Sequence, residues 1–121
     1  MKNYTPEYLE QRALFELCAM LKGKYPEIEL LFHIPNGGRR DTAEAANLKK
    51  QGVRPGVPDL FLPVAHKGYH GLFIEMKRRD GGRLSDNQKR WLHLLQHQGY
   101  AAIVCHGAQE AADAIIDYLK E

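Results

Sequence analysis

The chain has 121 residues, of which 44% are hydrophobic and 26% charged, with a formal net charge of +2. A chain of this length suits a single domain over residues 1–121 with one core, because it can bury roughly two-thirds of the surface that its unfolded form exposes. No segment approaches the run of about 18 apolar residues that a membrane span needs, and the mildly basic charge neither demands nor excludes a nucleic-acid partner.

The first half of the chain predicts a helix, a strand and a short helix. A helix is expected over residues 6–22, because Thr5 can cap its start and Pro6 suits its first turn, before leucines that recur at helical spacing. Glu10 falls on the apolar face of this helix. The segment ELLFHI (29–34) predicts a strand, the segment PNGGRR after it predicts a loop, and a short helix is expected from residue 41 or 42 to about 51.

The second half predicts, in order, two strands, a helix, a third strand and a closing helix, over residues 59–64, 71–78, 85–98, 100–105 and 108–120. Ser85 and Gln88 have the spacing of a capping box at the start of the first of these helices. The order of elements predicts an α/β fold, in which helices flank a mixed central sheet.

The sharpest functional signal is the pair Pro58-Asp59, followed after 15 residues by Glu75-Met76-Lys77. Because side chains alternate along a strand, Glu75 and Lys77 point to one face and Met76 to the other. Two carboxylates about 4 Å apart repel by roughly 4 kcal/mol at an effective dielectric of 20, so Asp59 and Glu75 could meet only around a cation. Mg²⁺ or Mn²⁺ suits these oxygen ligands, and the Met76 backbone carbonyl could add another.

Such a site could hydrolyse phosphodiesters. A metal can activate a water and neutralise charge on the phosphate, and Lys77 could orient that water or the phosphate. The same short motif also fits an exposed, salt-bridged strand face, so the flanking residues must decide between the two interpretations.

Several longer segments carry a family resemblance: the EQ of the first helix, LLFHIPNGGRR, LKKQGVRPGVPDLFLPV, GYHGLFIEMKR, GGRLSDNQKRWL and GYAAIVCHG. Through them the chain resembles the virus-type replication-repair nuclease (VRR-NUC) domain, in its stand-alone phage and bacterial form. This family belongs to the PD-(D/E)xK restriction-endonuclease-like superfamily. The resemblance implies a restriction-endonuclease-like core, divalent-metal dependence and activity on DNA.

The resemblance also implies roles for individual residues. Metal binding falls to Asp59, Glu75 and the Met76 carbonyl, and catalysis to Lys77, with support from Gln88 and an acid of the first helix.

Two of the supporting residues have alternatives. We expect the helix acid to be Glu10, acting on the metal directly or through water, because an acid on an apolar face is costly unless it is paired or metal-bound. Glu7, one turn away, is its rival, and Glu10 could instead be a first-turn acid that interacts with the helix dipole. Gln88 could serve only as the capping-box partner of Ser85.

Polar and basic residues on loops and helices are candidates for contacts with DNA phosphates: Asn36, Arg39, Arg40, Lys49, Arg78 and Lys89. A hairpin loop and a solvated surface explain the same residues equally well. His93 and His97 are one turn apart, but with no third ligand evident they are interpreted as surface histidines. Cys18 and Cys105 are expected to be free, buried thiols.

The sequence therefore predicts a DNA endonuclease that is specific for branched or Holliday-junction-like DNA in replication, repair or recombination. A homodimer would suit a symmetric substrate. No secretory signal or GxxxxGK loop is present, so we expect a cytoplasmic protein without a nucleotide cofactor. The alternatives are a non-catalytic DNA-binding module of the same fold and a restriction-type endonuclease.

Overall fold

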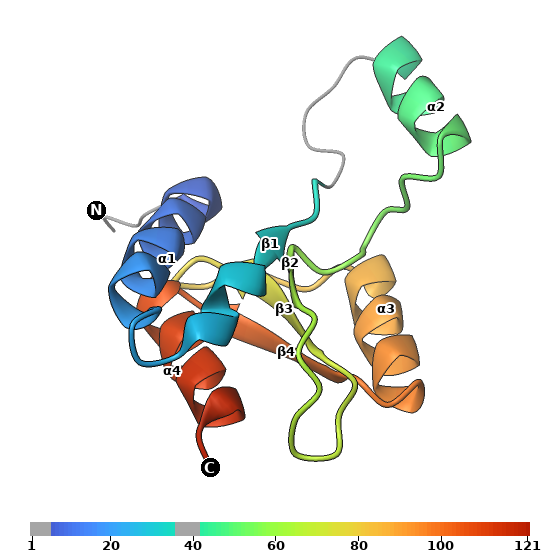
Figure 1. Ribbon diagram of the computed structural model, residues 1–121. Helices are drawn as coiled ribbons and strands as arrows, with labels where there is room; N and C mark the ends of the chain where they lie inside the picture. The colour runs from blue at the N-terminus through green and yellow to red at the C-terminus, as the bar shows by residue number, and fades with distance from the viewer. Residues whose placement is uncertain (1–5, 36–41) are drawn as a thin grey trace.

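A computed structural model describes residues 6–35 and 42–121 of the chain. The described elements are, in chain order, α1 (Glu7–Leu21), the 3₁₀ helix η1 (Pro26–Leu30), β1 (Phe32–His33), α2 (Thr42–Lys50), β2 (Leu60–Leu62), β3 (Leu72–Lys77), α3 (Asp86–His97), β4 (Ala101–His106) and α4 (Ala108–Leu119). Figure 1 shows the strands at the centre with helices on both sides. The predicted α/β class is confirmed.

The described strands form a mixed sheet in the order β1-β2-β3-β4. β2 pairs antiparallel with both β1 and β3, whereas β3 and β4 run parallel. The parallel pair is longer than the antiparallel pair: β2 stops opposite Ile74, but β4 accompanies β3 as far as Lys77. The last residues of β3 therefore have a strand neighbour on one edge and an open edge on the other.

The two faces of β3 have different surroundings. Ile74 and Met76 belong to the hydrophobic core, together with Leu14 of α1 and Ile115 of α4. α3 lies on the opposite side of the sheet, as Figure 1 shows, and faces the side chains of Glu75 and other residues of the second face. The apolar core thus fixes the strand from behind while its polar residues face α3.

The predicted strand over 29–34 is wrong in its first half. Pro26 starts a 3₁₀ turn, since its fixed φ suits the first helical position. Local hydrogen bonds follow, from Ile28 N to Tyr25 O (3.0 Å) and from Leu31 N to Ile28 O (3.0 Å). Only Phe32–His33 remain as a strand.

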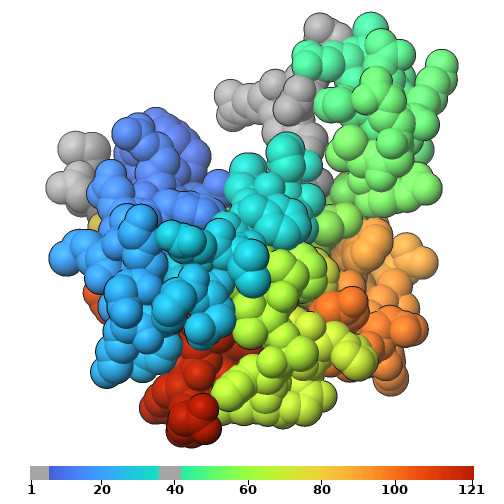
Figure 2. Space-filling model, viewed as in Figure 1, coloured from blue at the N-terminus to red at the C-terminus, as the bar shows by residue number. Residues whose placement is uncertain are grey.

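The other helices lie close to their expected positions. α1 begins at Glu7 with Pro6 at its N-cap, and the proposed cap Thr5 lies outside the described residues. The capping box of Ser85 and Gln88 is present at the start of α3. α2 buries none of its own residues, and Figure 2 shows it standing out from the rest of the surface. It ends at Lys50, close to the expected end at about residue 51, and Gly52 follows with φ +100°.

Both cysteines are free and buried, as predicted. Burial raises the pKa of Cys18 to about 11, and burial, with a contribution from Glu110, raises that of Cys105 to about 12. Both thiols therefore stay protonated near neutral pH. Within the described ranges, none of the helices has the length and apolar character to cross a membrane.

Candidate active site

Asp59 is held at the end of β2 by backbone contacts on both sides. Its carbonyl oxygen accepts hydrogen bonds from Ile34 N (2.7 Å) and from the His33 ring (Nδ1, 3.0 Å). Its side-chain Oδ2 accepts one from Met76 N (2.8 Å). Asp59 directly precedes β2, and its carboxylate thus takes the hydrogen bond from Met76 that the backbone of a longer β2 would have accepted.

β3 presents Glu75 and Lys77 together on the face opposite Met76, as strand alternation requires. Both charged side chains are buried: Glu75 is 2% exposed and Lys77 6%. Lys77 Nζ lies 3.7 Å from Glu75 Oε2. An acid and a lysine this deeply buried need partners, and each is a partner of the other.

The backbone of Met76 faces the open edge of β3. The carbonyls of Gly71 and Lys77 accept hydrogen bonds from Ala101 and Gly107, at the two ends of β4. Alternation then turns the N–H and C=O of Met76 toward the β2 edge, since both groups of one strand residue point the same way. The bond from Met76 N to Asp59 lies on that edge, so the Met76 carbonyl opens there too.

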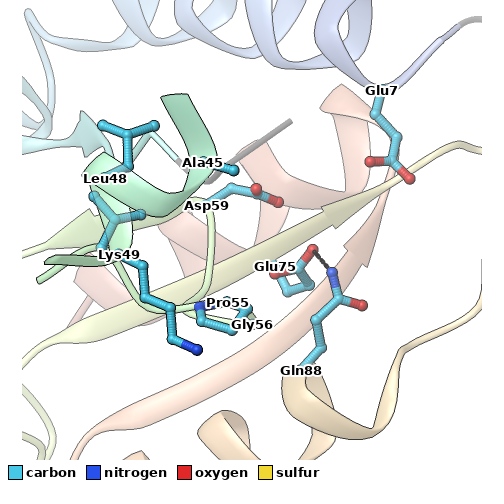
Figure 3. Close-up of a pocket in the computed structure, with 10 residues that line it drawn as sticks. Glu7, Ala45, Leu48, Lys49, Pro55, Gly56, Asp59, Glu75 and Gln88 are labelled. Carbon is cyan, nitrogen blue, oxygen red and sulfur yellow. Dashed lines mark hydrogen bonds between the residues drawn. The ribbon is translucent and has the colours of Figure 1, made fainter. Parts of the chain in front are cut away.

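Gln88 joins the start of α3 to the strand residues. Its Nε2 donates to Glu75 Oε2 (3.2 Å), which is the dashed line in Figure 3. Its Oε1 accepts hydrogen bonds from Lys77 Nζ (3.1 Å) and from Ser85 N (2.9 Å). The two predicted alternatives for Gln88, helix cap and site contact, are both present in one side chain.

Of the two first-helix acids, the structure brings Glu7 to the site. Glu7 Oε1 lies 3.9 Å from Lys77 Nζ. Glu10 is 3% exposed, as its apolar face predicted, but its oxygens accept hydrogen bonds from Arg79 Nε (2.7 Å) and from Ala108 N (3.1 Å). Glu10 therefore joins α1 to the end of β3 and to α4, and its contacts do not include Asp59 or Glu75.

Several of these side chains line a cavity of about 540 Å³, which we call the site cavity. It is lined by Glu7, Ala45, Leu48, Lys49, Val53, Pro55, Gly56, Asp59, Glu75 and Gln88. In Figure 3, Glu7 and Lys49 lie on opposite sides of the two central acids. Gly56 is needed in its wall, because a Cβ there would lie 2.6 Å from the backbone of Asn87.

The electrostatics of Glu75 are those of a buried carboxyl whose lysine neighbour only partly offsets the cost of burial. Burial, then the charge of Asp59 and a hydrogen bond with its carboxyl, raise the pKa of Glu75 to about 8, while Lys77 opposes the rise. Among the described residues, Glu75 Oε1 has no hydrogen-bond donor although it is buried. A proton shared with Asp59, or a cation, would satisfy this oxygen.

The site cavity offers the ligand atoms that a hard divalent cation prefers, namely carboxylate oxygens and a nearby backbone carbonyl. No group of three or more His, Cys, Asp or Glu side chains in the described part of the chain is arranged to hold a metal. Two protein carboxylates still suit Mg²⁺, which retains several waters and accepts ligands from the substrate.

The structure describes only some of the residues that are expected to contact DNA. Lys49 lines the site cavity, and Lys89 is exposed on α3 beside a second cavity. Arg78 is half-buried and lines neither. Asn36, Arg39 and Arg40 lie outside the described residues. Lys49 and Lys89 are therefore the candidates that the structure places near the acids and Lys77.

Arg79 and His106 were not predicted to take part in contacts near the site. Arg79 is one of several adjacent basic residues, and only the fold shows that it pairs with Glu10. His106 ends β4 directly opposite Lys77 in the parallel register. Its proximity depends on the pairing of β3 with β4, which no local pattern in the sequence specifies.

Comparison with known proteins gives one family. Residues 7–109 match the sequence profile of the VRR-NUC domain. A solved structure titled "VRR_NUC domain protein" is similar with a TM-score of 0.82 and 29% sequence identity, over 96% of this chain and 89% of the other. No protein in the curated set matches the chain.

Proposed function

Because the chain belongs to the VRR-NUC family, a family of nucleases, we propose that it is a divalent-metal-dependent DNA endonuclease. It would hydrolyse phosphodiester bonds at the site cavity, and residues 1–121 would act as a single nuclease domain. The observation that carries this proposal is the convergence of Asp59, Glu75 and Lys77, all held in fixed positions by backbone or Gln88 contacts.

The residues at the site cavity fit Mg²⁺ or Mn²⁺. Asp59, Glu75 and the Met76 carbonyl would hold the ion, and the unpartnered Oε1 of Glu75 is the oxygen that most needs one. The bound ion would supply an activated water and would offset charge on the phosphate.

Lys77 has the position of a catalytic lysine. Its ammonium lies between Glu75 and Glu7 and is oriented by Gln88. A buried, pre-oriented ammonium stabilises developing negative charge on a phosphate more strongly than a mobile surface lysine would, since it need not reorganise during the reaction. Gln88 is then a positioning residue that acts through Lys77 and Glu75.

Glu7 takes the role of the helix acid in this proposal. Its side chain is 47% exposed and lies near Lys77, so it would reach the reacting groups through water. Glu10, whose oxygens are occupied by Arg79 and Ala108, keeps a structural role.

For the substrate we propose branched DNA, such as a four-way junction, cut by a homodimer in replication, repair or recombination. The family supports a nucleic-acid substrate, and a closed two-fold dimer would present two equivalent sites to two symmetric strands.

The test is cleavage of labelled linear, nicked, flapped and four-way-junction DNA in Mg²⁺, Mn²⁺ or EDTA. We expect the intact protein to cut in the presence of either metal but not in EDTA. Asp59→Ala and Lys77→Ala should each lose about 100-fold or more in rate, the scale of removing one electrostatic stabiliser. Matched controls are Asp113→Ala and Lys22→Ala, exposed residues outside the site cavity, which should cut normally.

Binding of DNA without cutting of any substrate would contradict the proposal and favour the non-catalytic module. Cutting only at one base sequence, with no preference for branches, would instead favour the restriction-type endonuclease. Light scattering gives the number of protein subunits in the protein–junction complex. One subunit per junction would contradict the proposed homodimer.

A further inference from the structure

A second cavity, of about 390 Å³, adjoins Lys77, and we call it the basic cavity. It is lined by Lys77, Gly82, Arg83, Leu84, Lys89, Val104 and His106. The loop after β3, the exposed side of α3 and the end of β4 thus all contribute to its wall. The proposed hydrolysis needs Lys77 but does not use the remaining basic residues.

The two cavities have opposite charge. In the site cavity three acids, Glu7, Asp59 and Glu75, outnumber the one lysine of its lining, Lys49. By contrast, every ionisable side chain in the described lining of the basic cavity is a lysine, an arginine or a histidine. A concave surface with one sign of charge concentrates ions of the other sign. The basic cavity therefore favours an anion, as the site cavity favours a cation.

His106 is held so that one ring nitrogen remains for a ligand. Its Nδ1 lies 3.1 Å from the carbonyl oxygens of Arg78 and Gly81, which can only accept hydrogen bonds. Nδ1 therefore carries a proton, and Nε2 is the ring atom left to contact a ligand. Glu110 accepts a hydrogen bond from the His106 backbone N–H (2.8 Å) and is not part of the lining.

The loop is also shaped to pass close to Lys77. Gly82 has φ +87°, and a Cβ at this position would lie 3.3 Å from Lys77 Cδ. A side chain here would be strained and would crowd the lysine stem. Glycine keeps that part of the basic cavity open.

Lys77 and Gln88 connect the cavities. Lys77 lines the basic cavity, Gln88 lines the site cavity, and Lys77 Nζ donates to Gln88 Oε1 (3.1 Å). An anionic ligand in the basic cavity would therefore lie next to the phosphate that is cut.

We infer that the basic cavity binds an internal, uncut phosphate of the same DNA strand, next to the scissile one, through Arg83, Lys89 and His106. The inference rests on the proposed nuclease function and adds a subsite to it. A phosphate anchored there fixes the register of the strand, so the neighbouring phosphate is presented to Lys77 and the acids.

The first test is DNA binding in EDTA, where no cutting is expected, measured by fluorescence anisotropy across a salt series. The double variant Arg83→Ala/Lys89→Ala should bind at least about 10-fold more weakly, and its salt slope should fall by about 1 to 2 relative to the intact protein. Arg90→Ala is the matched control, since it removes a charge from the same helix outside the basic cavity. A double variant with the affinity and salt slope of that control would overturn the inference.

The second test locates the phosphate. Substrates without terminal phosphates carry one neutral methylphosphonate at successive positions beside the cut. At one position the intact protein should show a raised KM, and the double variant should show no further rise there, because coupled contacts are non-additive. An equal rise in KM for both proteins at every position would overturn the inference. Failure of the intact protein to cut unmodified DNA would contradict the nuclease proposal instead, and the EDTA series would still test the subsite.

Discussion

At the scale of single residues, Gln88 combines two tasks that substitution can separate. Gln88→Glu keeps the capping box, because a glutamate oxygen can accept from Ser85 N as the glutamine oxygen does. It removes the N–H that donates to Glu75 and adds another carboxylate beside it. We expect the midpoint of thermal unfolding to stay close to that of the intact protein at pH 5, where the carboxylates are least ionised, while cleavage falls about 10-fold or more at pH 8.

Gln88→Ala is the companion variant. It loses the cap as well as the contacts with Glu75 and Lys77, so it should lower the free energy of unfolding by about 1 kcal/mol in addition to slowing cleavage. Equal activity of Gln88→Glu and the intact protein at saturating metal would show that the site contact has no catalytic consequence.

The raised pKa of Glu75 predicts how stability depends on pH in EDTA. Between the ordinary value of 4.5 and about 8, the folded protein holds a proton that the unfolded chain has released. Raising the pH through this window therefore lowers the free energy of unfolding. Urea unfolding at pH 5.5 and 8 should show this loss, and Glu75→Gln should reduce it. The exposed control Glu16→Gln should not, and an unchanged pH slope in Glu75→Gln would refute the assignment.

The acids of the first helix show where residue-level prediction succeeds and where it fails. Burial of Glu10 followed correctly from its place among apolar residues, because helical spacing is local. Its partners did not follow, since Ala108 is 98 positions away and Arg79 is 69. A buried acid must be paired or bind a metal, and here pairing explains the burial without a metal.

Through these contacts Glu10 joins three elements, because it fastens α1 to the end of β3 and to the start of α4. Glu10→Gln should lower the free energy of unfolding by about 1–3 kcal/mol, the range for a hydrogen bond to a charged group, while metal-dependent cleavage persists at low temperature. Glu7→Gln should do the reverse, with little change in stability and slower cleavage. Denaturant unfolding and initial rates on both variants decide which acid serves the site, and loss of cleavage in a folded Glu10→Gln protein would return the role to Glu10.

Helices and strands whose signals lie within their own sequence were the easiest to predict. α3 and α4 have capping or periodic signals within themselves, and β3 is an apolar run in which only Glu75 and Lys77 are charged. The short strands were harder. β1 has two residues and depends on pairing with β2, while the turn at Pro26 competes for the residues before it.

For the molecule as a whole, the acids of the site cavity should couple metal binding to stability. Mg²⁺ or Mn²⁺ that binds only the folded protein stabilises it, by about 2.7 kcal/mol at a concentration 100 times Kd. The gain should be larger at pH 8 than at pH 6, because the ion must displace the proton held by Glu75. Thermal unfolding with and without metal measures this effect. Asp59→Asn should lose most of the gain, and an equal gain in that variant would place the bound ion elsewhere.

A mixed sheet with helices on its faces was within reach of the sequence, because the order of elements restricts how a sheet can be connected. The open edge of β3 could not be predicted from the sequence. It arises because β2 begins only at Leu60, opposite Ile74, while β4 accompanies β3 as far as Lys77, a difference in strand length that single-residue propensities do not encode. Yet this edge is where the Met76 backbone faces Asp59.

The bond between Glu10 and Ala108 also bears on when a newly made chain becomes active. Glu75, Lys77 and Gln88 can meet as soon as β3, α3 and β4 have been synthesised. At about 5–20 residues per second, Ala108 follows Glu10 off the ribosome by roughly 5 to 20 seconds. Until then α1 lacks its attachment to α4, and Glu7 has no fixed place beside Lys77. A nascent chain would thus complete the proposed site only once Ala108 has been made, so the acids and Lys77 would lack Glu7 until α4 can form.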